Sequence, residues 1–236
     1  MPTALIPFLD PQAIIAAAGP WALLVVCFIV FAETGLLIGF LLPGDTLLVI
    51  SGLLTNTSRV FGVDIWWVCL AIGFAAFLGG EAGYWIGHKS GPRIFEQKDS
   101  GIFSRENVRR TNAFFKRFGA LAIILARFVP IVRTFAPVAA GIGHMNRRKY
   151  SLYNLIGALL WGVGLTFFGY LLGYIPPVAD FVQKYIDVIL IVAVTTTLVP
   201  TLWQYFRTQR AAKLHAGEPP LTDEEVILSP EVFDEN

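Results

Sequence analysis

The sequence predicts an all-α integral membrane protein in which an inverted repeat places two re-entrant helical hairpins face to face. Three observations predict this fold. The 236 residues are 55% hydrophobic and 15% charged, with a mean hydropathy of +0.63, whereas soluble domains carry about 25% charged residues. The charged residues lie mostly between long apolar runs, and prolines interrupt two of these runs. The two halves of the chain also share short sequences at a nearly constant offset.

The first half contains a broken apolar segment followed by a spanning helix. The apolar run 21–42 predicts a helix that ends just before Pro43, because proline lacks the amide donor. The next run, 46–54, would cover only about 14 Å, too little for a hydrocarbon core of about 30 Å. We therefore expect a half-helix after a break at Pro43 and Gly44. Residues 65–87 are long enough to cross the bilayer.

The second half has the same order of segments. Residues 88–117 hold eight Lys/Arg against three Asp/Glu, and apolar residues recur within them at helical spacing. This pattern predicts an interfacial amphipathic helix. The apolar run 118–143 contains Pro130 and Pro137, which predict breaks in a second hairpin. Residues 151–175 are then expected to cross.

The distribution of Lys and Arg distinguishes a re-entrant segment 118–143 from a crossing one, because cytoplasmic loops are enriched in these residues. If the segment re-enters, the basic residues outside the apolar segments divide 14 against two; if it crosses, they divide nine against seven. The first division is the more unequal, so this rule favours a re-entrant segment. It places residues 55–64 outside and the C-terminus in the cytoplasm.

A short internal repeat supports two related halves. GYWIG at 83–87 corresponds to GYLLG at 169–173, and Pro43 corresponds to Pro130 at an offset that differs by one residue. Because the charge distribution puts the two hairpins on opposite sides, the repeat is inverted, as in many secondary transporters.

These segments define the expected domain organisation. A transmembrane domain covers 1–206, with repeat 1 over about 11–87, repeat 2 over about 103–175 and an extra final span over 186–206. Residues 207–236 form an acidic, proline-containing tail, which we expect to be cytoplasmic and disordered.

Five charged residues lie well inside the apolar segments, where charge is costly and usually faces a cavity or a partner: Glu33, Asp45, Glu81, Arg127 and Arg133. We expect Arg127 and Arg133 to bind a phosphate headgroup, because the guanidinium fork matches phosphate oxygens. Glu33 and Asp45 are expected to couple protons to this binding, and Glu81 is a candidate cavity-lining residue. The alternative interpretation is a structural ion-pair cluster that joins the two hairpins.

Other functional classes find little support in the sequence. The formal net charge of +1 and the absence of nucleic-acid-binding motifs argue against nucleic-acid partners. The three histidines lack metal-ligand spacing, so we expect neither a metal nor a cofactor. No nucleophile or nucleotide motif indicates an enzyme.

Three passages resemble the DedA family, also called the SNARE-associated or VTT-domain family: FAETGLLIGFLLPGDTLLVISG at 31–52, GGEAGYWIGHKSG at 79–91 and ARFVPIVRTFAPVAAGIGHM at 126–145. The resemblance covers about residues 20–175. It implies two facing re-entrant hairpins, with the family's acidic pair at Glu33 and Asp45 and its arginines at Arg127 and Arg133.

The residues and the resemblance together predict a multi-pass flippase of a bacterial cytoplasmic membrane. Its expected partners are protons and membrane lipids, and its expected substrate is a polyprenyl phosphate such as undecaprenyl phosphate. The alternatives are a nonselective phospholipid scramblase, a proton-coupled small-molecule or ion antiporter, and a non-transporting structural or assembly protein.

Overall fold

The computed structural model describes residues 20–36, 44–57, 59–90, 105–181, 184–185, 228 and 230–233. All the regular elements in these residues are helices. The labelled helices are α2 (Pro20–Gly35), α3 (Gly44–Thr57), α4 (Ile65–Ser90), α6 (Arg105–Phe118), η3 (Gly119–Leu121), α7 (Ala122–Ala126), α8 (Pro130–Ile142), α9 (Arg147–Ala158), η4 (Leu159–Val163), α10 (Gly164–Leu172) and η5 (Pro230–Phe233). Residues 176–181 and 184–185 are also helical.

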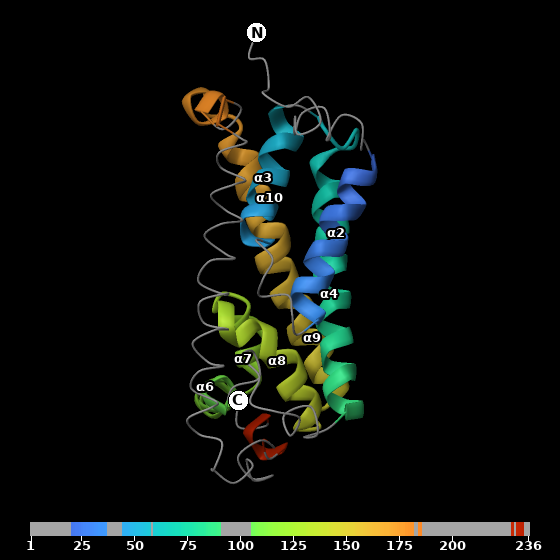
Figure 1. Ribbon diagram of the computed structural model, residues 1–236, viewed down its shortest axis with the longest axis vertical. Coiled ribbons are helices and arrows are strands. Elements are labelled where there is room, and N and C mark those ends of the chain that lie inside the picture. Colours follow the sequence, from blue (N-terminus) through green and yellow to red (C-terminus); the bar gives the residue numbers. More distant parts are fainter. Residues whose placement is uncertain are drawn as a thin grey trace, which may run out of the picture.

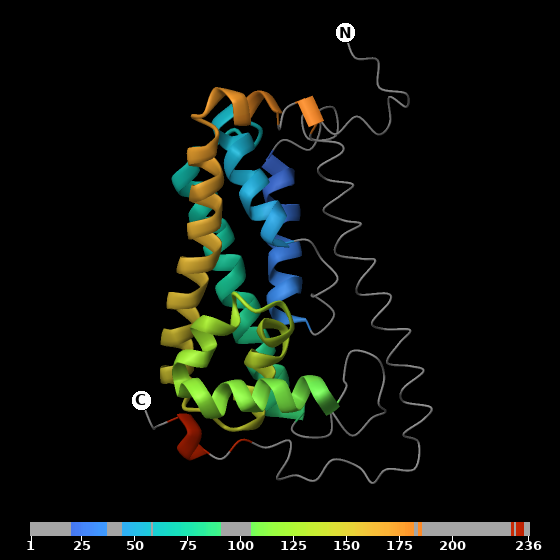
Figure 2. The same ribbon diagram turned by 90° about the vertical axis from the view of Figure 1, so that its left-hand side faces the viewer.

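Two long helical rods organise the bundle: α4, and the continuous run of α9, η4 and α10 (Figure 1). α2 packs on α4, and α3 packs on α10. At the other end of the bundle α8 packs on α4 and α7 packs on α9. α6 lies crosswise at this end, near η5 (Figure 2). Each rod therefore contacts helices from both halves of the chain.

The two rods have the length and composition of membrane spans. Ile65–Ser90 and Arg147–Leu172 are each 26 residues long, or about 39 Å at 1.5 Å per residue, against a hydrocarbon core of about 30 Å. Many large apolar side chains on α2 and on the rods point outward, among them Trp21, Phe28, Trp66, Trp67, Phe74, Leu152, Leu160 and Phe168. An exposed apolar surface of this extent suits lipid rather than water.

The first apolar helix ends earlier than the sequence predicts. α2 stops at Gly35 instead of continuing to residue 42, and Gly35 lies directly against the backbone of Gly79 in α4. The predicted break at Pro43 and the predicted span 186–206 lie outside the described residues.

The second broken segment has one break, not two. α7 ends at Ala126 and α8 begins at Pro130, with Val129 extended (φ −116°, ψ 106°) as a residue before proline prefers. The prediction of a break at Pro137 is wrong, because α8 continues through it to Ile142. Close packing explains this continuity: the ring of Pro137 lies against Gly83 of α4, where the absence of a side chain makes room for it.

α6 is amphipathic, as predicted. Phe115 and Thr111 are buried on one face, while Lys116 and Arg117 are exposed on the other. The buried face packs in a core cluster formed at this end of the bundle by α6 to α9, with Tyr84 of α4 and Phe233 of η5.

Part of the C-terminal tail belongs to that cluster. Leu228 and Phe233 are each 2% exposed, and the Phe233 ring lies edge-on to Phe115, with centroids 5.5 Å apart. The Nζ of Lys149 donates a hydrogen bond to the Phe233 carbonyl. The expected disorder of the tail does not extend to these residues, because their apolar side chains pack in the core cluster. The acidic composition of the tail gives no sign of this contact.

Candidate functional site: a buried arginine cluster

Arg133 joins the two broken segments through both predicted carboxylates. From the first turn of α8 it donates to Asp45 of α3, with 2.8 Å between Nη1 and Oδ1, and to Oε1 of Glu33 in α2. The Glu33 side chain is fully buried, whereas the Asp45 side chain is 51% exposed. Three helices thus meet at one guanidinium, and only one of its two carboxylates is accessible.

The N-terminus of α3 places Asp45 at this point and leaves room for Glu33 of α2. Asp45 lies in the first turn of α3, where the partial positive charge of the helix stabilises an anion. Gly44 lies directly over the Glu33 carboxylate, and a Cβ there would occupy the position of Oε2. Gly44, which the sequence assigns to a hairpin break, therefore also makes room for Glu33.

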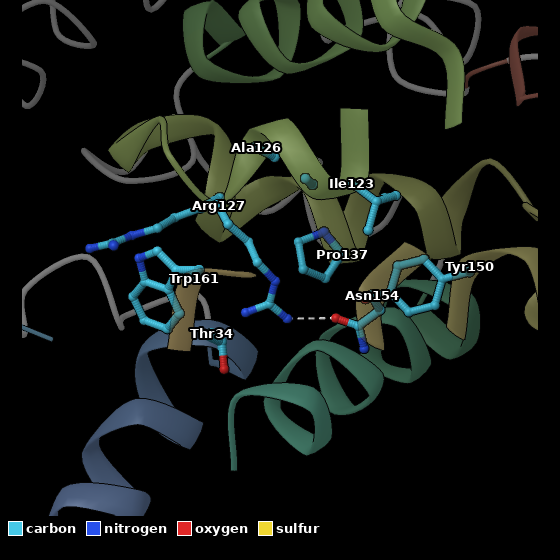
Figure 3. A pocket seen from close by; sticks show the side chains of 10 residues that line it. Thr34, Ile123, Ala126, Arg127, Pro137, Tyr150, Asn154 and Trp161 are labelled. Carbon is cyan, nitrogen blue, oxygen red and sulfur yellow. Dashed lines mark hydrogen bonds between the residues drawn. The ribbon is translucent and has the colours of Figure 1, made fainter. Parts of the chain in front are cut away.

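Arg127 is placed differently. It lies in the turn between α7 and α8 and is 7% exposed. Its Nη2 donates to Oδ1 of Asn154 at 2.6 Å (Figure 3). The same Nη2 donates to the carbonyl of Ala76 at 3.2 Å. Among the described residues no carboxylate forms an ion pair with Arg127, and its Nη1 is buried without a hydrogen-bond partner. Among the described residues Arg127 is therefore a buried cation with neutral acceptors.

Trp161 lies between the two arginines and is a site residue that the sequence analysis missed. Its Nε1 donates to Oδ1 of Asp45 at 2.8 Å. The Cζ atoms of Arg127 and Arg133 lie 5.9 Å and 5.6 Å from the centre of its ring, within cation–π range. Its position in the middle of a span was the available signal, because membrane-anchoring tryptophans lie near span ends.

Asn154 is the second residue that the sequence analysis missed, because that analysis considered only charged residues within the apolar runs. Besides accepting from Arg127, it donates through Nδ2 to Oε1 of Glu81 at 3.1 Å and to the carbonyl of Phe77 at 3.0 Å. Glu81 is not among the residues that line the cavity at the arginines. It is connected to the cluster through Asn154.

A small cavity lies beside the two guanidinium groups. It has a volume of about 20 Å³, room for about one water molecule. Thr34, Arg127, Arg133, Pro137, Tyr150, Asn154 and Trp161 are among its lining residues (Figure 3). Two guanidinium atoms of the cluster, Nη1 of Arg127 and Nε of Arg133, are buried with no partner in the described part of the chain. The cluster therefore retains donor capacity for an anion, although a phosphate group requires the helices to separate.

The described residues contain no group of three or more His, Cys, Asp or Glu side chains arranged to hold a metal ion. The donors of the cluster are guanidinium, indole and amide N–H groups, which suit an anion rather than a cation.

Comparison with known proteins identifies the family of the chain. The VTT domain family matches residues 42–171, the part that contains α3, both rods and the two arginines. The chain belongs to the DedA/VTT family of membrane proteins. This confirms the resemblance found in the sequence. Asp45, Arg127 and Arg133 lie within the matched region, while Glu33 lies before it.

Curated relatives cover most of this VTT-domain protein. It is 40% identical over 220 residues to an uncharacterized membrane protein of Mycobacterium leprae, covering 92% of this chain and 97% of the relative. It is 39% identical over 201 residues to Protein DedA of Escherichia coli K12, covering 85% and 91%. It is 33% identical over 177 residues to the inner membrane protein YghB of Salmonella typhimurium, covering 73% and 77%. No solved structure matches the chain.

Proposed function

We propose that this protein transports a phosphate-bearing lipid across the bilayer, with undecaprenyl phosphate as the substrate, and has no catalytic activity. The observation that carries the proposal is Arg127, a buried guanidinium with only neutral acceptors among the described residues. A buried cation without an opposite charge is costly and is usually paired. A phosphate at the cavity would supply the missing charge and would accept hydrogen bonds from Arg127 and Arg133.

The carboxylates supply a means of proton coupling. While Glu33 and Asp45 are ionised, both compete with phosphate for Arg133. Protonation removes their charge and frees the guanidinium, so phosphate binding strengthens as the pH falls. Because Asp45 is exposed and Glu33 is buried, Asp45 exchanges protons with the surroundings first. The hairpins then separate to admit the headgroup, while the prenyl chain stays in lipid.

The packing of the helices supports the inverted repeat behind this mechanism. α3 of the first hairpin packs on α10, the rod of the second half, and α8 of the second hairpin packs on α4, the rod of the first half. Both contacts depend on glycine: Gly52 and Gly169 lie against opposing backbone between α3 and α10, as Gly87 and Gly141 do between α4 and α8. Such reciprocal pairs are what a two-fold relation between the halves predicts.

The proposed location is a bacterial cytoplasmic membrane, crossed several times, with the C-terminus in the cytoplasm. α3, with 14 residues, covers about 21 Å and is too short to span, which supports a re-entrant hairpin. α6 contains basic residues of the stretch 88–117, and α9 begins with the basic residues 147–149. These elements lie at the end of the bundle where the positive-inside rule expects the cytoplasm.

Lipid binding tests this proposal. Undecaprenyl phosphate and phosphatidylglycerol are presented to the purified protein at one acidic and one alkaline pH, and bound lipid is measured by native mass spectrometry. We expect selective binding of undecaprenyl phosphate that strengthens at acidic pH and is lost in Arg127→Ala. Arg148→Ala is the matched control, because Arg148 is exposed at the start of α9. Equal binding of both lipids favours the nonselective scramblase, and binding of neither favours the antiporter or the structural protein.

A structural role is the second candidate, and a specific observation favours it. The Glu33–Arg133–Asp45 network joins α2, α3 and α8, and removing one partner of a buried ion pair is strongly destabilising. If the network is only structural, Glu33→Gln lowers thermal stability without changing the pH dependence of lipid binding. If it couples protons, Glu33→Gln flattens that pH dependence.

A further inference from the structure

Trp161 occupies an unusual place in its rod. It is 2% exposed and lies in η4, a single turn of π-helix between α9 and α10. A π-turn accommodates an extra residue, which changes the direction of its side chains relative to a continuous α-helix, and such turns occur often at functional sites. Here the turn lies where the indole meets groups from both broken segments.

A buried tryptophan N–H usually finds a hydrogen-bond partner. The acceptor of Trp161 is Asp45, which Arg133 also binds at the same oxygen, Oδ1. The face of the same indole lies near both guanidinium groups of the cluster. One side chain therefore contacts an accessible carboxylate and the two cations that would hold the anion.

We propose that Trp161 is a positioning residue of the charged cluster: its indole N–H holds the Asp45 carboxylate beside Arg133 and thereby helps to set the pH dependence with which Arg133 becomes available to phosphate. The part concerning phosphate rests on the proposed function. The link between Trp161 and the charge of Asp45 does not, since it follows from the contacts alone.

Three charged groups surround the contact between Asp45 and Trp161. Arg133 of α8 contacts Asp45 directly, and Glu33 of α2 shares that guanidinium. Arg127, in the turn before α8, lies on the same indole. The indole N–H donates to the Asp45 carboxylate. Removing that donor changes the contact between Asp45 and Arg133 and leaves the contact between Glu33 and Arg133 in place.

The first experiment measures the contact itself. The protein contains six tryptophans, and the indole N–H resonance of Trp161 is assigned in ¹⁵N-labelled protein by its loss in Trp161→Phe. We expect this resonance to shift with pH in the wild type and to stop shifting in Asp45→Asn, which keeps an acceptor oxygen but cannot titrate. A resonance that ignores pH in the wild type, or still titrates in Asp45→Asn, overturns the proposal.

The second experiment measures the consequence for undecaprenyl phosphate in detergent. Trp161→Phe keeps an aromatic ring but removes the N–H, and we expect the midpoint of the pH dependence of binding to shift by about one unit. Trp67→Phe is the matched control, because Trp67 is 64% exposed on α4, and its midpoint should equal that of the wild type. A uniform loss of affinity at every pH in Trp161→Phe would show a merely structural role and overturn the proposal. If the wild type binds no phosphate lipid, the proposed function fails, and the resonance experiment alone decides the role of Trp161.

Discussion

At the scale of single residues, the two arginines of the cluster differ in what holds them. Arg133 binds two carboxylates, so its charge is already compensated when both are ionised. Arg127 binds an amide and a backbone carbonyl. Two guanidinium groups side by side are therefore held in different charge environments. Substitutions that change only one of these environments separate anion binding from structural stability.

Asn154→Asp tests whether the missing charge at Arg127 is functional. The new carboxylate would lie 2.6 Å from Nη2 of Arg127, where the Asn154 oxygen is now, and would pair with the cation. The substitution also replaces the Nδ2 donor to Glu81 and to the Phe77 carbonyl by an oxygen, so we expect some loss of thermal stability. We expect the folded protein to bind undecaprenyl phosphate at least tenfold more weakly, because the new carboxylate compensates the charge of Arg127. Undiminished phosphate binding in this variant would contradict the assignment of Arg127.

Arg133→Lys tests the guanidinium fork. Lysine keeps the positive charge but cannot bind Glu33 and Asp45 through two parallel donors or present a bidentate group to phosphate. We expect the dissociation constant for undecaprenyl phosphate to rise about tenfold, measured by titration in detergent. An affinity equal to that of the wild type would show that only the charge at this position matters.

At the scale of elements, the helices approach closely wherever glycine replaces a side chain. Gly169 of α10 lies against the carbonyl of Val49 in α3, whereas a Cβ at Gly164 in the same helix would meet nothing within 4 Å. These two positions share a helix and a residue type but differ in their surroundings. They therefore isolate the contribution of close packing.

Alanine at each glycine measures that contribution. Gly169→Ala is expected to destabilise the protein by about 1–3 kcal/mol, because the new methyl group collides with backbone that must move. Gly164→Ala is expected to stabilise it by about 0.5–1 kcal/mol through helix propensity alone. The free energy of unfolding in mixed micelles measures both effects. Equal effects of the two substitutions would refute the close contact between α3 and α10.

At the scale of the whole molecule, the two ends of the bundle differ in charge and construction. One end carries the 59–64 turn between α3 and α4. The other carries the crosswise α6 with exposed Lys116 and Arg117, and the segment 230–233 of the tail. The positive-inside rule assigns the basic end to the cytoplasm.

Cysteine labelling in intact cells tests this orientation. In a variant without Cys27 and Cys69, a cysteine replaces either Val63 or Lys116, both of which are exposed. We expect a membrane-impermeant maleimide to label the Val63→Cys protein from outside and the Lys116→Cys protein only after permeabilisation. Labelling of both from the same side would contradict the proposed topology.

Much of the fold was predictable because lipid imposes simple rules on sequence. The segment 65–87 needed only its length and composition to be predicted as a helix, and α4 confirms it. Pro130 marked the start of α8 because its missing amide fits the first turn of a helix. The same missing amide led to the wrong prediction of a break at Pro137. Whether a helix continues through a proline depends on the residues packed around it, here Gly83.

The sequence by itself determined the helical membrane class, the family and the charged residues worth examining. Burying charge is costly, so charged residues are rare within apolar segments and can be recognised from the sequence alone. Only the tertiary structure decided how those residues pair: Arg133 with two carboxylates, Arg127 with Asn154, and Trp161 with Asp45. These contacts join residues 27 to 116 positions apart. No local pattern specifies such pairs, since they form only when the broken segments meet between the two rods.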